Sequence, residues 1–423
     1  MQAFVKAVLT FLVTTAALLL LFNLTLGDKQ IDARIEAAYS VSDPQFQRTM
    51  GALLGPPITG GNRVQALRNG DEIFPAMLQA IRDARETVTF ETYIYWSGSI
   101  GQEFADALME RARAGVRVHV LIDWWGAGDI SERYQRQMEA AGVEMRLYNP
   151  PRISTLARMN IRTHRKLLVI DGRIGFTGGV GIADPWRGNA QDPQHWRDMH
   201  YRVEGPVVAQ LQAAFGDNWI AVSGQVLHGP GYFPQLQDAG THAAQVFTSA
   251  AGGGAEDVQL MYVLSMAAAR STVRLSMAYF VPDTAALQTL VAARSRGVRV
   301  QLILPGPHMD RSFVRRASRF EWGPLLRAGV EINEYQPTMY HSKVMIVDEL
   351  WTSVGSTNFD SRSFSVNDEA NLNIHDAGFA REQVRIFDDD LAVSRRVTLA
   401  EWEGRAWRDK LLDALAGIFS SQL

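Results

Sequence analysis

Two short stretches of the sequence carry the same pattern of histidine, lysine and aspartate. The first is T-H-R-K-L-L-V-I-D at residues 163–171, and the second is Y-H-S-K-V-M-I-V-D at residues 340–348. Each polar residue of the first stretch is separated from its counterpart by the same number of positions. The six residues are His164, Lys166, Asp171, His341, Lys343 and Asp348. Protein cores rarely contain histidine and lysine, so packing does not explain a repeat this regular. The repeat instead indicates one active site built from two similar halves.

The spacing within each stretch brings an imidazole and an ammonium group to one face. Alternate side chains of an extended segment point the same way, so His164 lies beside Lys166, and His341 beside Lys343. Each pair is followed by an apolar run typical of a buried strand, which would hold the pair rigidly at the edge of a sheet. If the two halves meet, two lysines approach one point, and they repel each other unless an anion lies between them.

A phosphodiester is the anion that suits such a site. Fixed cations stabilise the charge that gathers on its oxygens when a nucleophile attacks phosphorus. Histidine has a reference pKa of about 6.5, so one neutral imidazole can attack while the other donates a proton to the leaving alcohol. A covalent phosphohistidine would then let a second alcohol enter later. This chemistry requires no metal or cofactor, and the sequence shows no convincing cluster of metal ligands.

The bulk composition narrows the class of protein. A chain of 423 residues has room for two or three domains. Its net charge of −3 creates no strong overall field that would favour nucleic acid. The chain has no cysteine, which excludes disulfides, thiolate metal sites and cysteine nucleophiles.

The N-terminal segment differs from a globular sequence. Residues 7–26 are uncharged and mostly apolar, and as a helix they would span ~30 Å, the thickness of a bilayer core. A cleaved signal peptide is the competing interpretation. The length of the run and the lack of an A-x-A type site favour an uncleaved transmembrane anchor over residues 1–27. The orientation stays open, because Lys6 precedes the run and Lys29 and Arg34 follow it.

The rest of the chain alternates between strand and helix patterns, and it does so twice. In the first half the patterns predict a helix near 72–85, a strand over 87–95, a helix over 101–114 and a strand over 116–123. In the second half they predict a helix near 255–269, a strand over 272–280, a helix over 284–296 and a strand over 298–305. This order predicts an α/β fold of two similar domains with the active site at their interface. The predicted units are an anchor (1–27), a connector (28–60), a first domain (61–223), a linker (224–254) and a second domain (255–423).

The repeated motif resembles the signature of the phospholipase D superfamily, which is H-x-K-x4-D followed by G-G or G-S. Both copies are present here, and the resemblance covers nearly everything from about residue 61 onward. Other stretches are similar to bacterial cardiolipin synthases. They are G-N-R-V-Q-A-L-R-N-G-D-E-I-F-P at 61–75, E-T-Y-I-Y at 91–95, Y-F-V-P-D at 279–283 and G-S-T-N-F-D-S-R-S at 355–363.

The resemblance assigns roles to the matching residues of this chain. It implies that His164 and His341 act as nucleophile and general acid, with His164 favoured as the nucleophile. In this superfamily, acids downstream of each motif usually orient the histidines. The candidates here are Asp198 and Glu369, and each of them is in a position to reach the histidine of the other half.

The family also implies a set of phosphate ligands, and this chain departs from it at one position. The expected ligands of the phosphate oxygens are Lys166, Lys343 and Asn358. The family usually has an asparagine in the first half at the position that corresponds to Asn358, but this chain has Gly181. A water, a backbone N–H or a neighbouring side chain would have to replace that amide. Asp171 and Asp348 are expected to brace the loop rather than to contact the substrate.

The resemblance implies a membrane-bound phosphatidyltransferase, most simply a cardiolipin synthase that converts two phosphatidylglycerol molecules into cardiolipin and glycerol. A phospholipase D-type hydrolase or nuclease is the alternative enzyme. A lipid-binding protein that has lost catalysis is the alternative of another class. The expected partners are phosphatidylglycerol or a related anionic lipid and the membrane, with no nucleic acid. The expected location is the bacterial inner membrane, and the oligomeric state is left open.

One further pattern lies near the C-terminus. Trp407, Leu411, Leu415 and Ile418 form an apolar stripe at helical spacing. Packing of this stripe against the second domain is the simpler expectation, and binding at a membrane interface is the alternative.

Overall fold

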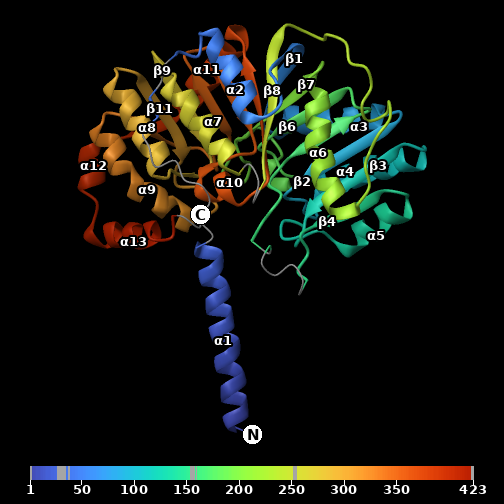
Figure 1. The fold of residues 1–423 in the computed structure, drawn as a ribbon, viewed down its shortest axis with the longest axis horizontal. Coiled ribbons are helices and arrows are strands. Elements are labelled where there is room, and N and C mark those ends of the chain that lie inside the picture. The colour runs from blue at the N-terminus through green and yellow to red at the C-terminus, as the bar shows by residue number, and fades with distance from the viewer. Residues whose placement is uncertain are drawn as a thin grey trace.

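The computed structural model describes residues 2–25, 35–36, 39–152, 158, 160–250 and 255–420, apart from the side chains of residues 2–4, 18–25 and 255–257. The chain begins with the helices α1 (Gln2–Thr25) and α2 (Pro44–Leu54). It continues with two halves of mixed helix and strand, which lie next to each other in Figure 1.

Strands and helices alternate through the first part of each half, as the sequence predicts, and runs of consecutive strands follow. The first half contains β1 (Thr59–Arg68), α3 (Asn69–Asp83), β2 (Thr87–Thr92), α4 (Ser99–Arg113), β3 (Arg117–Asp123), α5 (Glu132–Ala140), β4 (Glu144–Tyr148), β5 (Leu167–Ile170), β6 (Ile174–Gly178), η2 (Asp184–Trp186), β7 (Met199–Glu204) and α6 (Val208–Ser223). The second half contains β8 (His242–Ser249), α7 (Ala255–Ala267), β9 (Thr272–Met277), β10 (Phe280–Val281), α8 (Thr284–Ser295), β11 (Arg299–Pro305), α9 (Ser312–Arg327), β12 (Glu331–Tyr335), β13 (Lys343–Val347), β14 (Trp351–Gly355), β15 (Phe359–Asp360), α10 (Ser361–Ser365), β16 (Glu369–His375), α11 (Ala377–Ala392), β17 (Ser394–Val397), α12 (Leu399–Glu403) and α13 (Trp407–Gly417).

The two halves share one sheet. Within the described residues it has 15 strands in the order β17-β12-β11-β9-β13-β14-β16-β8-β1-β7-β6-β5-β2-β3-β4. Outward from the junction of β8 and β1, the strands of one half match those of the other in turn, so β5 and β13 hold equivalent places. β1 and β8 are antiparallel, which is the pairing that a two-fold rotation between two similar halves produces. The two copies of the motif therefore lie in equivalent positions on either side of the junction.

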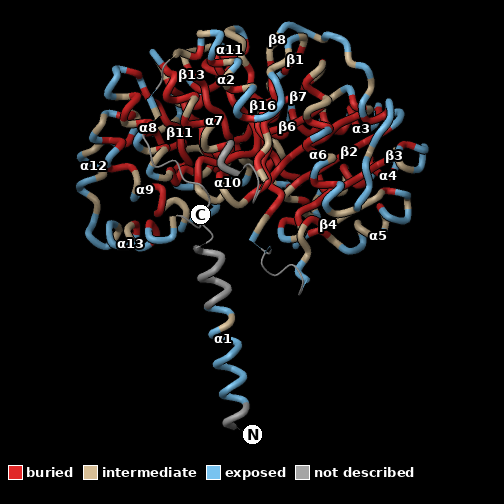
Figure 2. The backbone as a smooth tube through the Cα atoms, in the orientation of Figure 1, coloured by how far each residue is buried: buried red, intermediate tan, exposed pale blue. Residues whose placement is uncertain are grey.

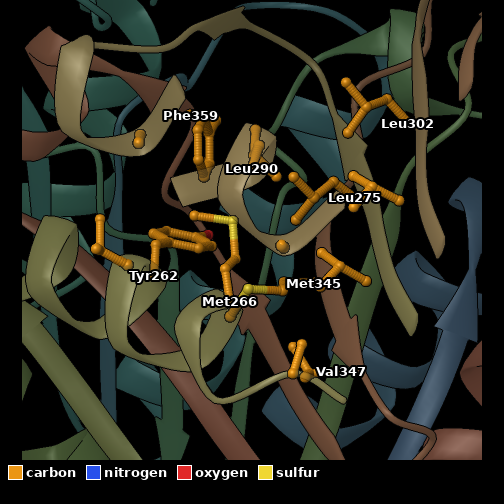
Figure 3. Close-up of a cluster of buried hydrophobic side chains, with 14 of the residues drawn as sticks. Tyr262, Met266, Leu275, Leu290, Leu302, Met345, Val347 and Phe359 are labelled. Atoms are coloured by element: carbon orange, nitrogen blue, oxygen red, sulfur yellow. The ribbon is translucent and has the colours of Figure 1, made fainter. Parts of the chain in front are cut away.

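The sheet is buried on both faces, as Figure 2 shows along the strands. In β5, Leu168 belongs to the apolar cluster that includes α3 and α4, whereas its neighbour Leu167 belongs to a cluster that includes α6. In β13, Met345 and Val347 lie in the cluster drawn in Figure 3, and Ile346 between them belongs to the cluster on the opposite face. Burial on both faces explains why each motif continues into an unbroken apolar run.

The N-terminal helix α1 extends away from the globular part of the molecule (Figure 1). The side chains of residues 5–17 are almost all exposed, and that of Phe11 is 69% exposed. Among the residues that the structure describes, no helix combines the length and the apolar character that a membrane crossing requires. The predicted anchor, residues 1–27, lies only partly within the described residues, and it stays a prediction.

The segment 224–254, predicted as a linker, contains a strand of the central sheet. β8 pairs with β1 of the first half and with β16 of the second half, so it forms the junction. Its sequence H-A-A-Q-V-F-T-S begins with small and polar residues, which hid the strand pattern. The boundaries of the predicted domains stay predictions.

The C-terminal apolar stripe does not pack against the second domain, so that expectation is wrong. The side chains of Trp407, at the start of α13, and of Ile418, just after its end, are 69% and 71% exposed. The helix buries Asp413 and Ala416 instead, because the carboxylate of Asp413 pairs with arginines of the body.

Candidate active site

The histidine of each motif makes a backbone hydrogen bond to the other half. The N–H of His164 donates to the carbonyl of Asp368 over 2.8 Å, and the N–H of His341 donates to the carbonyl of Arg197 over 2.7 Å. Residues 367–369 lead into β16, and residues 197–198 lead into β7. In the sheet β16 pairs with the junction strand β8, and β7 pairs with the junction strand β1. The seam between the halves therefore sets the position of both imidazoles.

A carboxylate from the opposite half holds each imidazole, as the sequence analysis anticipated. Nδ1 of His164 lies 2.9 Å from both carboxylate oxygens of Glu369. Nδ1 of His341 lies 2.7 Å from Oδ2 of Asp198. A carboxylate accepts a hydrogen bond from the N–H at Nδ1 of a neutral ring, which leaves the lone pair of Nε2 for a substrate.

The two carboxylates are themselves held differently. The hydroxyl of Ser356 donates to Oε2 of Glu369 over 2.6 Å. The counterpart of Ser356 in the first half is Gly179, where an added Cβ would lie only 2.2 Å from Oδ1 of Asp198. The indole N–H of Trp186 instead donates a hydrogen bond to Oδ2 of Asp198 over 2.9 Å.

Both lysines of the motif fold back beside their own histidine. Nζ of Lys166 donates to the carbonyl of His164 over 2.7 Å, and Nζ of Lys343 donates to the carbonyl of His341 over 2.6 Å. Nζ of Lys343 also lies 3.2 Å from Nε2 of His341. An ammonium group has three N–H donors, so each lysine retains donors for an anion.

One cavity of about 550 Å³ receives side chains from both halves, although Lys343 is not among its lining residues. His164, Lys166 and His341 line it together with Asn358. All four residues are less than 10% exposed, so the site is largely shielded from water. The structure thus brings residues of both motifs to one cavity, where two imidazoles can act on the same ligand.

Burial sets the protonation of these groups. Burial, aided by the two lysines, lowers the pKa of His164 to about 4, although Glu369 opposes the shift. Burial and the neighbouring Lys343 lower the pKa of Lys166 to about 7, and burial lowers that of Lys343 to about 8. Burial and Lys343 also lower the pKa of His341. The imidazoles are therefore neutral at pH 7 in the empty site, and the lysines repel each other.

The acids respond in the opposite way. Burial alone would raise the pKa of Glu369, but His164 and Lys166 outweigh it and lower that pKa. Burial likewise opposes His341 and Lys343 at Asp198, and the pKa of Asp198 is lowered. Both carboxylates are thus ionised acceptors for the imidazoles.

Trp186 explains the departure at Gly181. Gly181 lines the cavity, but an added Cβ would lie 2.9 Å from Cβ of Ile94 and 3.3 Å from the ring of Trp186. The indole thus stands next to the position where an asparagine side chain would start. Trp186 also packs edge-on against His341, with ring centroids 5.2 Å apart. The two halves are therefore chemically unequal: Asn358 has no amide counterpart at Gly181.

Two members of the repeated motif lie away from the cavity. The carboxylate of Asp171 accepts bonds from the N–H groups of residues 85–87, ahead of β2. The carboxylate of Asp348 accepts bonds from the N–H groups of residues 270–272, ahead of β9. Neither residue is part of the cavity lining. Their geometry is that of loop braces, and the catalytic role given to them with the rest of the motif stays a prediction.

Several lining residues were not singled out from the sequence. Tyr93 and Tyr279 follow β2 and β9 and lie edge-on to His164 and His341, at 5.3 and 6.3 Å. Burial raises the pKa of Asp360, another lining residue, to about 6. Both tyrosines follow a strand that pairs in parallel with a neighbour, and functional residues often lie at that end of such strands. This position in the sequence is the signal that would have identified them. Within the described residues no group of three or more acids and histidines is arranged to hold a metal ion.

Comparison with known proteins places this geometry in context. A family model described as "Cardiolipin synthase, PLD-like domain" matches residues 77–215 and 262–391. A cardiolipin synthase of Geobacillus kaustophilus (strain HTA426) is 33% identical over 370 residues, which cover 87% of this chain and 74% of that protein. Cardiolipin synthase A of Pseudomonas fluorescens (strain SBW25) is 34% identical over 376 residues, which cover 88% of this chain and 77% of that protein.

Solved structures are similar in fold. The phosphatidylserine synthase of Haemophilus influenzae Rd KW20 superposes with a TM-score of 0.64 at 15% identity. The match covers 85% of this chain and 94% of the other. The paired α/β halves are therefore a fold that occurs in another protein of low sequence identity.

Proposed function

The chain belongs to the family of cardiolipin synthases with PLD-like domains, and we propose that it converts two phosphatidylglycerol molecules into cardiolipin and glycerol through a phosphohistidine. The observation that supports this most is the single cavity lined by both histidines, each held by a carboxylate of the other half. Two imidazoles of unequal surroundings around one cavity suit a displacement carried out in two steps.

In the first step His164 is the nucleophile. Its Nε2 attacks phosphorus, and the bond from phosphorus to the oxygen of the glycerol headgroup breaks. The departing oxygen takes the proton from Nε2 of His341, so glycerol leaves as a neutral alcohol. The low pKa of His164, about 4, supports this role, because its ring is already unprotonated at neutral pH. Glu369 stabilises the positive charge that the ring then acquires.

In the second step the headgroup of another phosphatidylglycerol enters. Its hydroxyl oxygen attacks phosphorus while Nε2 of His341, now neutral, takes the hydroxyl proton. The bond from phosphorus to Nε2 of His164 breaks, and the product is cardiolipin. Both steps use the same two imidazoles in exchanged roles, so the site ends as it began.

The cations prepare the site for an anion. In the empty cavity burial lowers the pKa of both lysines, and Lys343 lowers that of Lys166 further. A phosphodiester between them removes this repulsion and raises the pKa of His341, which lets that ring carry the proton for the leaving group. Asn358, buried on the lining, is the expected amide ligand of a phosphate oxygen.

We also propose that the N-terminal segment 1–27 anchors the enzyme in the bacterial inner membrane. The uncharged run over residues 7–26 supports this, and so does the exposure of the described side chains of α1. Its substrates would then share the bilayer with it. A net charge of −3 favours neither nucleic acid nor a nuclease reaction.

The test is incubation of the purified full-length protein with radiolabelled phosphatidylglycerol in detergent. Cardiolipin and free glycerol in equal amounts are expected. Phosphatidic acid in place of cardiolipin would identify a hydrolase, and no turnover would identify a binding protein. His164→Ala and His341→Ala should each lower turnover by about 10³-fold or more, whereas the exposed His228→Ala should not change it.

A further inference from the structure

Helix α13 has its apolar side turned outward. The exposed apolar side chains of this helix and of the residues after it, here called the apolar face of α13, are Trp407, Leu411, Leu412, Leu415, Ile418 and Phe419. Their exposed fractions run from 45% for Leu412 to 71% for Ile418. A helix on the surface of a soluble protein normally presents its apolar side to the core.

Ion pairs fix the helix in this orientation. The buried Asp413 accepts a bond from Arg316 over 3.2 Å and another from Arg405. Arg316 also lies 3.5 Å from Asp409. A rotation that buried the leucines would leave Asp413 and its arginines without partners, which is costly for a buried charge.

Small residues complete the inward side. Ala416 and Gly417 are buried, and an added Cβ at Gly417 would lie 2.6 Å from the ring of Phe320 on α9. The close approach to α9 needs residues without bulk at these positions. The outward placement of the leucines is thus built into both the polar and the small residues of the helix.

The apolar face of α13 continues to the mouth of the cavity. The ring of Phe419 lies 6.1 Å from the ring of Phe313, at the start of α9. Phe313 is 46% exposed and lines the cavity that contains both histidines. Its neighbour Arg311 lines the same cavity with a side chain that is 67% exposed. An apolar path bordered by a cation therefore leads from α13 to the active site.

Charge and position indicate what covers this face. Arg408 and Lys410 are exposed beside the apolar residues, which is the composition of helices that lie on anionic lipid. In Figure 1, α13 lies at the lower edge of the globular part, the edge from which α1 extends. The exposed apolar side chains of α1 and of α13 thus occur at one end of the molecule.

We propose that the apolar face of α13, with Phe313, rests in the surface of an anionic lipid bilayer and sets the cavity mouth against it. A diacyl lipid could then enter the site headgroup first while its acyl chains stay in the bilayer. This rests on the proposed function, since it supposes a lipid substrate, and it adds the surface that orients the enzyme. The tether through α1 supplies proximity, and α13 supplies orientation.

The first test follows Trp407 by fluorescence. The full-length protein is reconstituted into phosphatidylglycerol vesicles with and without brominated acyl chains, which quench indoles in contact with them. The chain has 10 tryptophans, so the contribution of Trp407 is the difference between wild type and Trp407→Phe. That difference should be quenched by brominated lipid. An unquenched Trp407 would overturn the proposal, and so would a concentration-dependent dimer that buries Trp407.

The second test separates docking from chemistry. The triple variant Leu411→Ser/Leu415→Ser/Ile418→Ser changes only exposed side chains, and Val226→Ser/Phe233→Ser/Val393→Ser is a control of similar exposure elsewhere. With bilayer phosphatidylglycerol, kcat/KM of the α13 variant should fall by about tenfold or more. With short-chain, monomeric phosphatidylglycerol it should match wild type.

Each outcome of the second test has a clear meaning. Equal loss on both substrates, or no loss on either, would overturn the docking proposal and leave the proposed function intact. The control variant should match wild type on both substrates, and an equal loss in the control would also overturn docking at α13. If wild type converts neither substrate, the proposed function fails, whereas the quenching of Trp407 still decides whether α13 meets the bilayer.

Discussion

At the scale of single residues, the contact between Glu369 and His164 is the bond on which nucleophilic attack depends. Glu369→Gln keeps the shape of the side chain but offers no negative charge to the ring. We expect kcat for cardiolipin formation to fall by about 10⁴-fold, as loss of the carboxylate does in other histidine-based sites. The measurement is steady-state turnover of labelled phosphatidylglycerol. Glu132→Gln, at an 82% exposed side chain, is the control, and a variant Glu369→Gln within threefold of wild type would contradict the role.

The lowered pKa values of the site predict a bounded pH range of activity. His164 must be neutral to attack, so kcat/KM should rise as the pH increases through about 4. His341 must be protonated to release glycerol and Lys166 must be charged to hold the phosphate, so kcat/KM should fall as the pH increases, first through the lowered pKa of His341 and then through about 7 for Lys166. The measurement is kcat/KM from about pH 3 to about pH 9, which reports groups of the free enzyme.

Arginine at position 166 checks the assignment of the alkaline limb. A guanidinium keeps its charge throughout this range. Lys166→Arg should therefore remove the part of the alkaline fall near pH 7 and leave the part that His341 sets, whatever its maximal rate. An unchanged alkaline limb in this variant would assign the fall to another group.

The sequence predicted some residues of the site well and others not at all. The repeat identified both histidines and both lysines, because their spacing alone sets them apart from core residues. Trp186 escaped notice because D-P-W has no likeness to S-R-S, its counterpart in the repeat. Its contacts with Asp198 and with the space beside Gly181 depend on the fold. Asymmetry between the halves is what a repeat cannot reveal.

At the scale of elements, Asp348 ties the turn after β13 to the start of β9. Its carboxylate accepts bonds from three successive backbone N–H groups, and its own φ is +51°, in the left-handed region. Asp348→Ala loses these bonds and places a less suitable residue at that φ. We expect the free energy of unfolding of this variant to be about 2–4 kcal/mol lower than that of wild type.

Urea denaturation measures this loss, and turnover distinguishes a brace from a catalytic group. Because Asp348 does not line the cavity, kcat per folded molecule should stay within a few-fold of wild type. Asp348→Asn is the matched control, since asparagine tolerates the left-handed region and retains one acceptor oxygen. Normal stability together with lost turnover would make Asp348 a participant in the reaction.

Elements with strong periodicity were predicted from the sequence, and elements with weak periodicity were not. The helix expected near 72–85 is α3, although it begins earlier, at Asn69. β8 was missed because its small residues resemble a linker, and its pairing with β1 supplies what its own pattern lacks. The direction in which α13 faces was predicted wrongly, because an apolar stripe alone does not say whether protein or another medium covers it.

At the scale of the whole molecule, Arg165 joins the two halves beside the active site. Arg165 stands between His164 and Lys166 in the sequence, and its side chain is fully buried. Its guanidinium donates to the carbonyls of Ser249 and Glu369 in the second half. Its charge faces the buried Glu91. Arg165→Met fills the space but leaves these acceptors unpaired. We expect a loss of about 3–5 kcal/mol in the free energy of unfolding, with the exposed Arg133→Met as a control near zero.

The pH dependence of that loss identifies its electrostatic part. Burial raises the pKa of Glu91 from 4.5 to about 7, and Arg165 opposes the rise. A folded state that binds its proton more tightly than the unfolded chain loses stability as the pH rises, so wild type should lose stability from pH 4.5 to about 7 and then level off. Without Arg165 the pKa of Glu91 is higher still, so the decline continues past pH 7 by up to about 1.4 kcal/mol per pH unit.

Urea denaturation between pH 5 and pH 9 should therefore show a deficit in Arg165→Met that is constant at first and widens above about pH 7. A deficit that does not change with pH would mean that Arg165 holds the halves together through its hydrogen bonds alone.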